Sequence, residues 1–176
     1  MKLFELTEKV NETLLFHAAN PLKALHNFQK DLLVNDWGDR ALGSKLVSGI
    51  STSRNYRLAI SKQGYGPWVF VLDKTKLQYK YKIIPIDANT TIVEPGQQQS
   101  IPDRQYRLPG MEHSEELIVT NTLPNLHQYL QEILFVRGSD YEQDEIDYPD
   151  PNSDFKKAQK AAVLYSQKFS IPLKQV

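Results

Sequence analysis

The stretch Trp68-Val69-Phe70-Val71-Leu72-Asp73 decides the fold of this chain. Five apolar residues follow one another, and valine and aromatic residues are enriched in strands, so the stretch predicts a β-strand that is buried on both faces. The preceding Gly64-Tyr65-Gly66-Pro67 breaks the chain sharply, which marks where this strand begins. A strand buried on both faces is a central strand, and we expect the rest of the fold to be built around it.

Further strand signals lie on both sides of this segment. Short apolar or alternating runs predict strands at residues 13–18, 49–53, 79–86 and 116–119. Pro85 places the third of these at an end or an edge, because proline cannot donate to a neighbouring strand. Residues 123–134 lead into a helix or a strand.

Helix signals occur at both ends of the chain. Asn20-Pro21 is a helix start, with Asn as the N-cap, and the apolar spacing that follows predicts an amphipathic helix over 21–34. One or two helical turns are expected within 55–62, and a C-terminal helix over 155–169. The order of strand, helix, several strands and helix predicts an α+β fold with a largely antiparallel sheet.

The remaining segments are rich in turn residues. A loop is expected over 35–48, a long polar loop over 87–110 and an acidic loop over 137–154. A chain of 176 residues is the size of one domain, so we expect a single domain over 1–176.

Composition excludes several classes of function. Lysine plus arginine (21) equals aspartate plus glutamate (21), which disfavours non-specific nucleic-acid binding, and the absence of cysteine excludes disulfides and thiolate chemistry. The four histidines have no metal-site spacing, so no metal site is expected. The sequence also contains no Gly-rich motif that would bind phosphate. No run is apolar enough to span a membrane, and the charged N-terminus is unlike a signal peptide. These features predict a soluble, cytoplasmic protein.

Three short segments could carry chemistry. They are Leu15-Phe16-His17-Ala18, Ile50-Ser51-Thr52-Ser53 and Ser114-Glu115-Glu116-Leu117-Ile118-Val119. Each one alone has an ordinary structural interpretation: a core histidine bonded to backbone, a Ser/Thr turn, and an acidic strand entrance.

In their order and spacing, the three segments resemble the ADP-ribosyltransferase superfamily. Its members carry His or Arg on the first strand, Ser-Thr-Ser on a middle strand and Glu at the mouth of a later one. The resemblance covers residues 14–136, where Trp68-Val69-Phe70-Val71-Leu72-Asp73 is similar to the strand that often follows Ser-Thr-Ser. It implies a split two-sheet, mostly antiparallel β core with flanking helices and a cleft that holds NAD.

The resemblance also implies roles for individual residues. Glu116 would be the catalytic carboxylate, which stabilises the cationic transition state as nicotinamide leaves NAD, and Ser51 would orient it. His17 would bond the ribose hydroxyls on the adenosine side, while Thr52 and Ser53 would shape the cleft. Side chains alternate along a strand, so we expect Glu115 to point away from Glu116, toward solvent.

Three more residues are candidates for cofactor binding. Arg54 would pair with the diphosphate of NAD, although a surface arginine is an equal alternative. Tyr56 or Tyr65 would stack on the nicotinamide. On the polar loop, Arg104, Tyr106 and Arg107 are the candidate contacts to an acceptor.

The resemblance therefore implies an NAD-dependent ADP-ribosyltransferase without a metal. Its acceptor would be a macromolecule, a protein or a nucleic acid, and the motifs mix features of several branches of the superfamily, so they do not identify it. The alternative is a non-catalytic α+β binding or structural module, because one fold hosts many functions.

Overall fold

The computed structural model describes residues 13–35, 40–42, 45–60, 66–86, 91–92 and 115–176. Within them, one sheet of seven strands has the order β12-β11-β6-β1-β5-β9-β7. Its strands are β1 (Leu14–Ala19), β5 (Ile50–Ser53), β6 (Trp68–Asp73), β7 (Ile83–Ile86), β9 (Glu115–Ile118), β11 (Leu130–Phe135) and β12 (Leu173–Gln175). All neighbours are antiparallel except β11 and β12, which run parallel.

Two smaller sheets and several helices complete the described part of the chain. β2 (Leu32–Val34) pairs with β10 (Thr122–Pro124), and β3 (Arg40–Leu42) pairs with β4 (Lys45–Val47) and β8 (Thr91–Ile92). The helices are α1 (Pro21–Lys30), α2 (Tyr56–Ala59), α3 (Lys74–Gln78), the short 3-10 helix η3 (Leu126–Gln128), α4 (Asp140–Asp147) and α5 (Asp154–Phe169). The fold is therefore α+β, with a mostly antiparallel sheet and flanking helices, as the sequence predicts.

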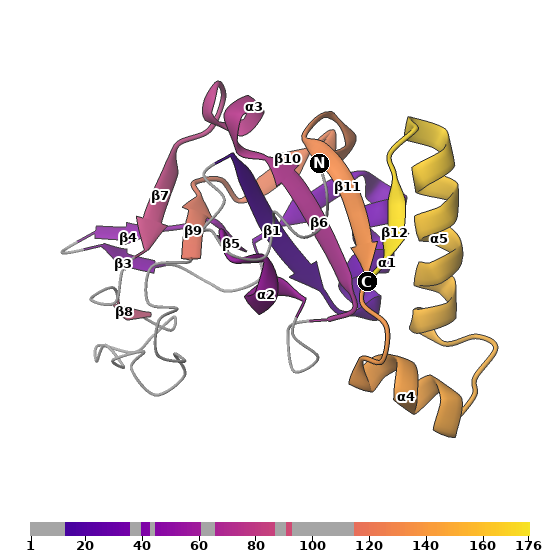
Figure 1. The fold of residues 1–176 in the computed structure, drawn as a ribbon. Coiled ribbons are helices and arrows are strands. Elements are labelled where there is room, and N and C mark those ends of the chain that lie inside the picture. The colour runs from indigo at the N-terminus through magenta and orange to yellow at the C-terminus, as the bar shows by residue number, and fades with distance from the viewer. Residues whose placement is uncertain (1–12, 36–39, 43–44, 61–65, 87–90, 93–114) are drawn as a thin grey trace.

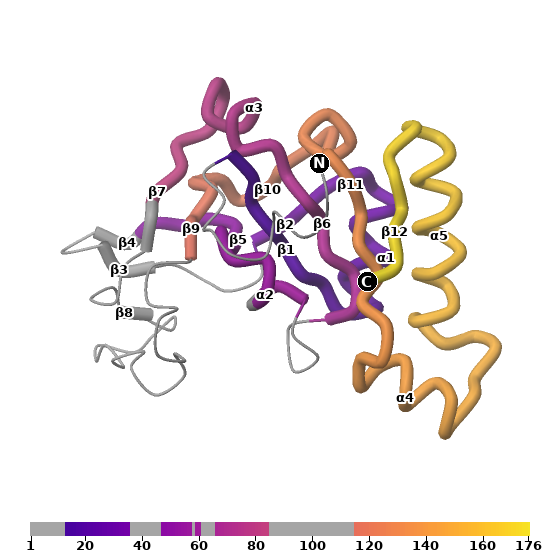
Figure 2. Tube along the Cα trace, in the orientation of Figure 1, coloured from indigo at the N-terminus to yellow at the C-terminus, as the bar shows by residue number. Residues whose placement is uncertain are grey.

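β6, the strand predicted at residues 68–73, lies inside the sheet. β6 pairs with β1 on one side and with β11 on the other, and Trp68 to Leu72 are at most 1% exposed. One face of this region packs against α1 and α5 (Figures 1 and 2), through side chains that include Phe28 and Phe155. Tyr56 of α2 packs against the other face. The continuous apolar run is thus explained by cover on both faces.

The first helix is shorter than the sequence predicts. α1 begins as expected, with the Asn20 side chain accepting from the Lys23 amide and proline at the first position. It ends at Lys30, because Asp31 adopts a left-handed conformation (φ 52°) and its amide donates back to the carbonyl of Asn27. Leu32 and Leu33, which were assigned to the helix by their spacing, instead belong to β2.

Two segments that were expected to be loops contain regular structure. Strands β3 and β4 lie within 35–48, and helix α4 lies within the acidic segment 137–154. Ser139 caps α4 by accepting from the Glu142 amide, while the Glu142 carboxylate accepts from the amide of Gly138. Acidic residues in a first turn also interact favourably with the helix dipole, so high charge here accompanies a helix and not a loop.

The strand expected over 79–86 is also shorter than predicted. The segment begins with a turn and not a strand, because the amides of Lys80 and Tyr81 donate to the carbonyl of Leu77 at 3.0 and 2.8 Å, at the end of helix α3. Pro85 lies in β7, which is an edge strand, as expected. The C-terminal helix is observed at 154–169, one residue longer than predicted.

Within the seven-stranded sheet, β1 and β5 are the neighbouring strands with the fewest aligned residue pairs. These two strands are registered through one residue pair, Phe16 opposite Ser53, whereas β1 and β6 align over six pairs. The sheet can therefore be divided at this joint into two halves. No described helix is long and apolar enough to cross a membrane.

Candidate functional site

His17, Thr52 and Glu116 form one row across three adjacent strands. Thr52 lies opposite Glu116, and because Phe16 lies opposite Ser53, the antiparallel register places His17 opposite Thr52. All three side chains therefore share one face of the sheet. They are also buried, with exposed fractions of 7%, 4% and 2%. Each of the three sequence segments thus supplies one residue of a polar row inside the protein.

His17 is fixed by the backbone of the neighbouring strand. Its Nδ1 lies 2.9 Å from the carbonyl oxygen of Ser51. A carbonyl oxygen only accepts, so Nδ1 carries the proton and donates it. The ring also lies beside Phe70, with 6.4 Å between ring centroids. The orientation of the imidazole and the proton on Nδ1 are therefore set by the fold.

Glu116 is a buried carboxylate between two cations. Lys74 Nζ donates to its Oε1 at 2.8 Å, and Arg54 Nε lies 3.2 Å from the same oxygen. Burial of an unpaired carboxylate would be very costly, and these two cations compensate for its charge. Its other oxygen, Oε2, accepts no hydrogen bond from any described residue. Among the described residues, Oε2 of Glu116 is thus a buried acceptor without a hydrogen-bond partner.

Thr52 holds the backbone at this position. Its Oγ1 donates to the carbonyl oxygen of Glu116 at 2.7 Å, in the interior. This bond crosses from β5 to β9 and keeps the carboxylate in register with His17. The structure places His17, Thr52 and Glu116 on one face and Arg54 beside Glu116, and the roles that the resemblance implies for these residues stay predictions.

Lys74 is part of the site but was not a candidate from the sequence. It directly follows β6, and its amide donates to the carbonyl of Thr13 at 2.9 Å, which anchors it beside the start of β1. Its side chain is 14% exposed and reaches Glu116, 42 residues away in sequence. Only the pairing of β6 with β1 and of β5 with β9 reveals this contact, and no local pattern indicates it.

The expected pairing of Ser51 with Glu116 is wrong. Ser51 Oγ donates to Oε1 of Glu115 at 2.6 Å. Residues 51 and 53 alternate with Thr52, so Ser51 and Ser53 lie on the face opposite the row, and so does Glu115. Glu115 is therefore partly buried and bonded, and it does not point to solvent as we expected.

Two other predicted site residues, Ser53 and Tyr56, do not join the row. The Ser53 hydroxyl accepts from the Asn55 amide at 2.9 Å and stabilises the turn after β5. Tyr56 is buried against Phe16 on the opposite face, with ring centroids 5.7 Å apart. Burial and the nearby charge of Glu132 raise the pKa of Tyr56, so it stays neutral. Tyr65, Arg104, Tyr106, Arg107 and most of the loop 87–110 lie outside the described residues.

A second polar cluster lies between α1, η3 and α5. The Asp31 carboxylate accepts from the His127 amide at 2.9 Å, contacts His127 Nδ1 at 2.5 Å and accepts from the Tyr165 hydroxyl. Burial and the hydrogen bond to Asp31 raise the pKa of Tyr165 strongly. His127 stacks on Phe169, with ring centroids 4.2 Å apart. The cluster connects three elements and holds Asp31, directly after the end of α1 at Lys30.

Among the described residues, no group of three or more His, Asp or Glu side chains is arranged to hold a metal ion. The chain was compared with protein-family models, with curated proteins and with solved structures, and none of the three comparisons found a match.

Proposed function

We propose that this protein transfers ADP-ribose from NAD to a macromolecular acceptor, with release of nicotinamide. The observation that carries the proposal is the buried row of His17, Thr52 and Glu116, in which one oxygen of Glu116 has no partner among the described residues. The resemblance of the three sequence segments to ADP-ribosyltransferases supplies the reaction. The row supports it because it brings together residues that the resemblance requires at one place.

The chemistry would use the charge of Glu116. In the reaction, the bond between the ribose C1′ and the nicotinamide nitrogen breaks, nicotinamide leaves with the electron pair, and positive charge develops on the ribose. A fixed carboxylate in a site with little water stabilises such a charge. A nucleophile of the acceptor then bonds C1′ and loses its proton. Oε2 of Glu116 has no partner among the described residues, and it would accept a hydrogen bond from a hydroxyl of the nicotinamide ribose. His17 would contact the ribose on the adenosine side.

Arg54 and Lys74 must then change partners when NAD binds. In the structure, both cations are directed at Oε1 of Glu116 and offset its charge. The diphosphate of NAD is a stronger acceptor for these cations, because it carries two negative charges. Once the cations move to it, the carboxylate would act on the ribose.

The two halves of the sheet also agree with this proposal. The superfamily's core is split into two sheets around NAD, and here β1 and β5 are registered through one residue pair. We propose that this joint corresponds to the split of an ADP-ribosyltransferase-like core.

A non-catalytic module is the second candidate, and one observation favours it. Glu116 is 2% exposed and is neutralised by two cations, which is also how a purely structural ion cluster is built. In that case the row would stabilise the fold or a binding surface, without turnover.

Nicotinamide release separates these candidates. Wild type incubated with NAD should release nicotinamide, which is measured by chromatography. The rate for Glu116→Gln should be about 10²–10³-fold lower, because losing one transition-state contact has roughly that effect. Glu115→Gln is the matched control, since Glu115 lies on the opposite face, and it should retain most activity. Thermal unfolding of each variant checks that it is folded.

NAD binding is measured in parallel by thermal shift. At 100 times its Kd, NAD should stabilise the wild type by about 2.7 kcal/mol. Stabilisation without nicotinamide release would favour the non-catalytic module. If millimolar NAD causes neither thermal stabilisation nor nicotinamide release, the proposal is overturned.

A further inference from the structure

A groove between α1 and α5 combines an apolar floor with a basic rim. It has a volume of about 340 Å³, and its floor includes Phe28 and Phe169. Leu164 lines it as well, although it is 57% exposed. Leaving a large apolar side chain in water is unfavourable, so such a groove gains stability when it is covered.

The rim of this groove is positively charged. Lys157, Lys160 and Lys168 line it, and none of the described residues that line it is acidic. Lys157 lies 3.8 Å from Asp154, while Lys168 lies over the ring of Phe169. An occupant that complements this surface carries apolar side chains together with several negative charges.

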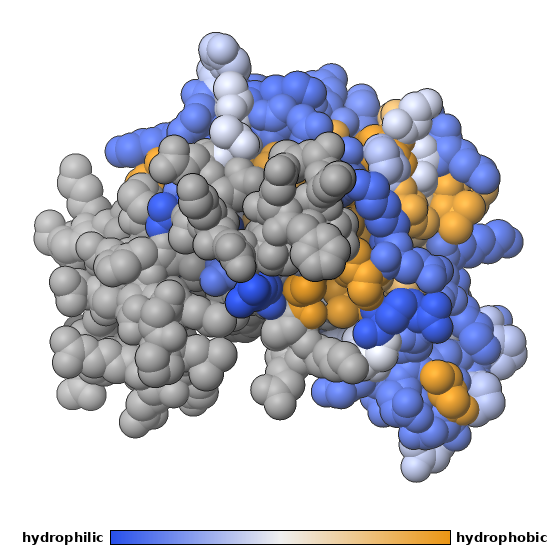
Figure 3. Space-filling model, viewed as in Figure 1, coloured by the Kyte–Doolittle hydropathy of each residue, from blue (hydrophilic) through white to orange (hydrophobic). Residues whose placement is uncertain are grey.

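The helix α4 of the same chain has this chemistry. None of its residues is buried, and Tyr141, Ile146 and Tyr148 at or just after it are 39%, 66% and 81% exposed. Figure 3 shows an isolated apolar patch over α4 within a hydrophilic surface. Asp144 and Asp147 lie on its exposed side. Because none of its residues is buried, this acidic helix obtains little stability from apolar contacts with its own chain.

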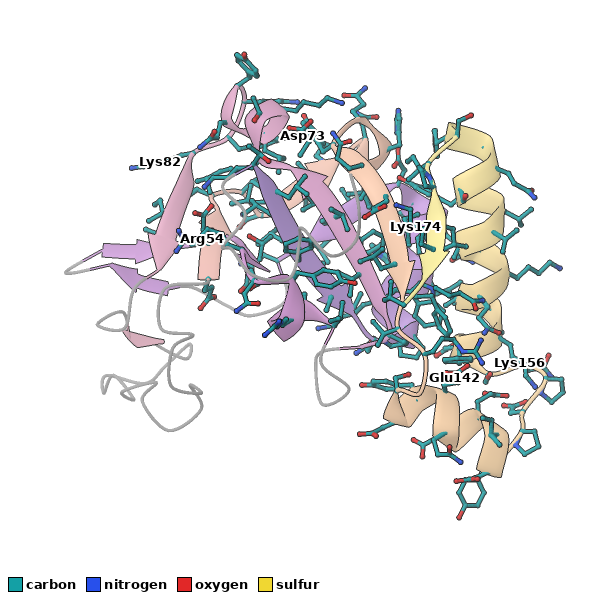
Figure 4. All side chains as sticks on the ribbon, in the orientation of Figure 1. Arg54, Asp73, Lys82, Glu142, Lys156 and Lys174 are labelled. Atoms are coloured by element: carbon teal, nitrogen blue, oxygen red, sulfur yellow. The ribbon has the colours of Figure 1, made fainter. Side chains whose placement is uncertain are left out.

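No residue of α4 lines the groove of its own chain. Glu145 is held by Lys156 at 3.0 Å, at the beginning of α5 (Figure 4), whereas the groove extends along that helix from Lys157 to Phe169. A helix of 16 residues is about 24 Å long. Two copies with antiparallel α5 helices would place each α4 beside the groove of the other copy.

We propose that this protein forms a two-fold dimer in which α4 of each copy occupies the α1–α5 groove of its partner. The contact is reciprocal, so it closes after two copies and does not continue into a filament. Apolar side chains of α4 cover the groove, and its aspartates face the lysine rim. Since neither surface includes His17 or Glu116, this inference does not depend on the proposed activity.

A charge swap tests the dimer by light scattering after size-exclusion chromatography. Wild type at high micromolar concentration should have twice the mass of one chain, which is 20.3 kDa. The groove variant Lys160→Glu/Lys168→Glu and the α4 variant Asp144→Lys/Asp147→Lys should each have the mass of one chain. Lysine near the end of a helix is favourable for its dipole, so the α4 variant should stay folded.

The combined variant carries both charge reversals and should be a dimer again, because opposite charges face each other once more. A variant that merely unfolds would not be rescued. The matched control Lys80→Glu/Lys82→Glu reverses two exposed lysines before β7 and should remain a dimer. A wild type with the mass of one chain, single variants that remain dimers, or a combined variant that stays monomeric would each overturn the proposal, as would assemblies larger than a dimer.

Discussion

The two halves of the seven-stranded sheet differ in length, burial and charge. The apolar half consists of β1, β6, β11 and β12, and the polar half of β5, β7 and β9. The first three strands of the apolar half each have six residues, whereas every strand of the polar half has four. Helices α1 and α5 cover the apolar half, while the polar half contributes the serines, the threonine and both glutamates.

This difference separates stability from candidate chemistry. The apolar half has enough covered surface to define the fold, so the polar half can retain groups that are costly to bury. The candidate site lies across the joint, with His17 on one half and Thr52 and Glu116 on the other. The predictions below test how far the two halves are independent.

The largest effect is expected from Trp68→Ala in the apolar half. Trp68 is 1% exposed, and its ring lies 5.3 Å from those of Phe135 and Phe155. Truncation leaves a cavity in a covered region and should reduce the free energy of unfolding by about 3–5 kcal/mol. Urea denaturation measures this loss. Tyr79→Ala, at a position that is 89% exposed, should change it by less than about 0.5 kcal/mol.

Lys74→Met should have a smaller effect, which reaches across the joint. The variant keeps much of the side-chain volume but removes the hydrogen bond to Glu116, and Arg54 remains as the second cation. A buried charged group that loses a partner costs about 1–3 kcal/mol. Urea denaturation checks this value, with Lys76→Met on the exposed side of α3 as the control. Equal stabilities of Lys74→Met and the control would show that the ion cluster adds nothing to stability.

Ser51→Ala tests the two faces of the polar half. It removes the hydrogen bond to Glu115 and should destabilise the fold by about 1–2 kcal/mol. The contacts of Glu116 remain in place, so the proposed nicotinamide release should stay close to that of the wild type. A Ser51→Ala variant that folds but releases nicotinamide 100 times more slowly would contradict the placement of Ser51 away from the site.

Tyr165→Phe tests the helical cover of the apolar half and should have the smallest effect, about 1 kcal/mol, because Asp31 keeps its contacts to His127. The raised pKa of Tyr165 makes the folded state bind its proton more tightly than the unfolded state. Its contribution is therefore complete below about pH 10, the value for an unfolded tyrosine, and falls as the pH rises further. Urea denaturation between about pH 8 and 11 should show a weaker alkaline decline for Tyr165→Phe. An unchanged decline would exclude this linkage.

The sequence predicts strands of both halves where the signal is local. Apolar or alternating runs place β1, β5, β6 and β9 to within one residue, because these elements depend on local patterns. No sequence signal identifies β12, and the segment 123–134 fits a helix as well as a strand. The early end of α1 could not be predicted, and Asp31, directly after it, contacts His127 and Tyr165, far away in sequence. For α4, however, Ser139 and Glu142 form a local capping signal that the acidic composition obscured.

The candidate site shows the same division. Alternation along β9 correctly separates Glu115 from Glu116, because it is a local rule. The register between β5 and β9 then decides which hydroxyl meets which carboxylate, and motif order does not contain that information. Lys74 could be found only from the three-dimensional arrangement, because it reaches Glu116 from the end of β6.

The single-residue joint between β1 and β5 sets how much work a ligand must do to separate the halves. The contacts that cross it include the pairing at Phe16 and Ser53 and the bond from His17 to the Ser51 carbonyl. A hydrogen bond contributes about 0.5–1.5 kcal/mol net, so breaking a few of them costs only a few kcal/mol. A ligand with micromolar affinity gains about 8 kcal/mol on binding. In backbone hydrogen bonds alone, opening the sheet at this seam therefore costs less than such a ligand gains, whereas parting β1 from β6, with six aligned pairs, would break several times as many.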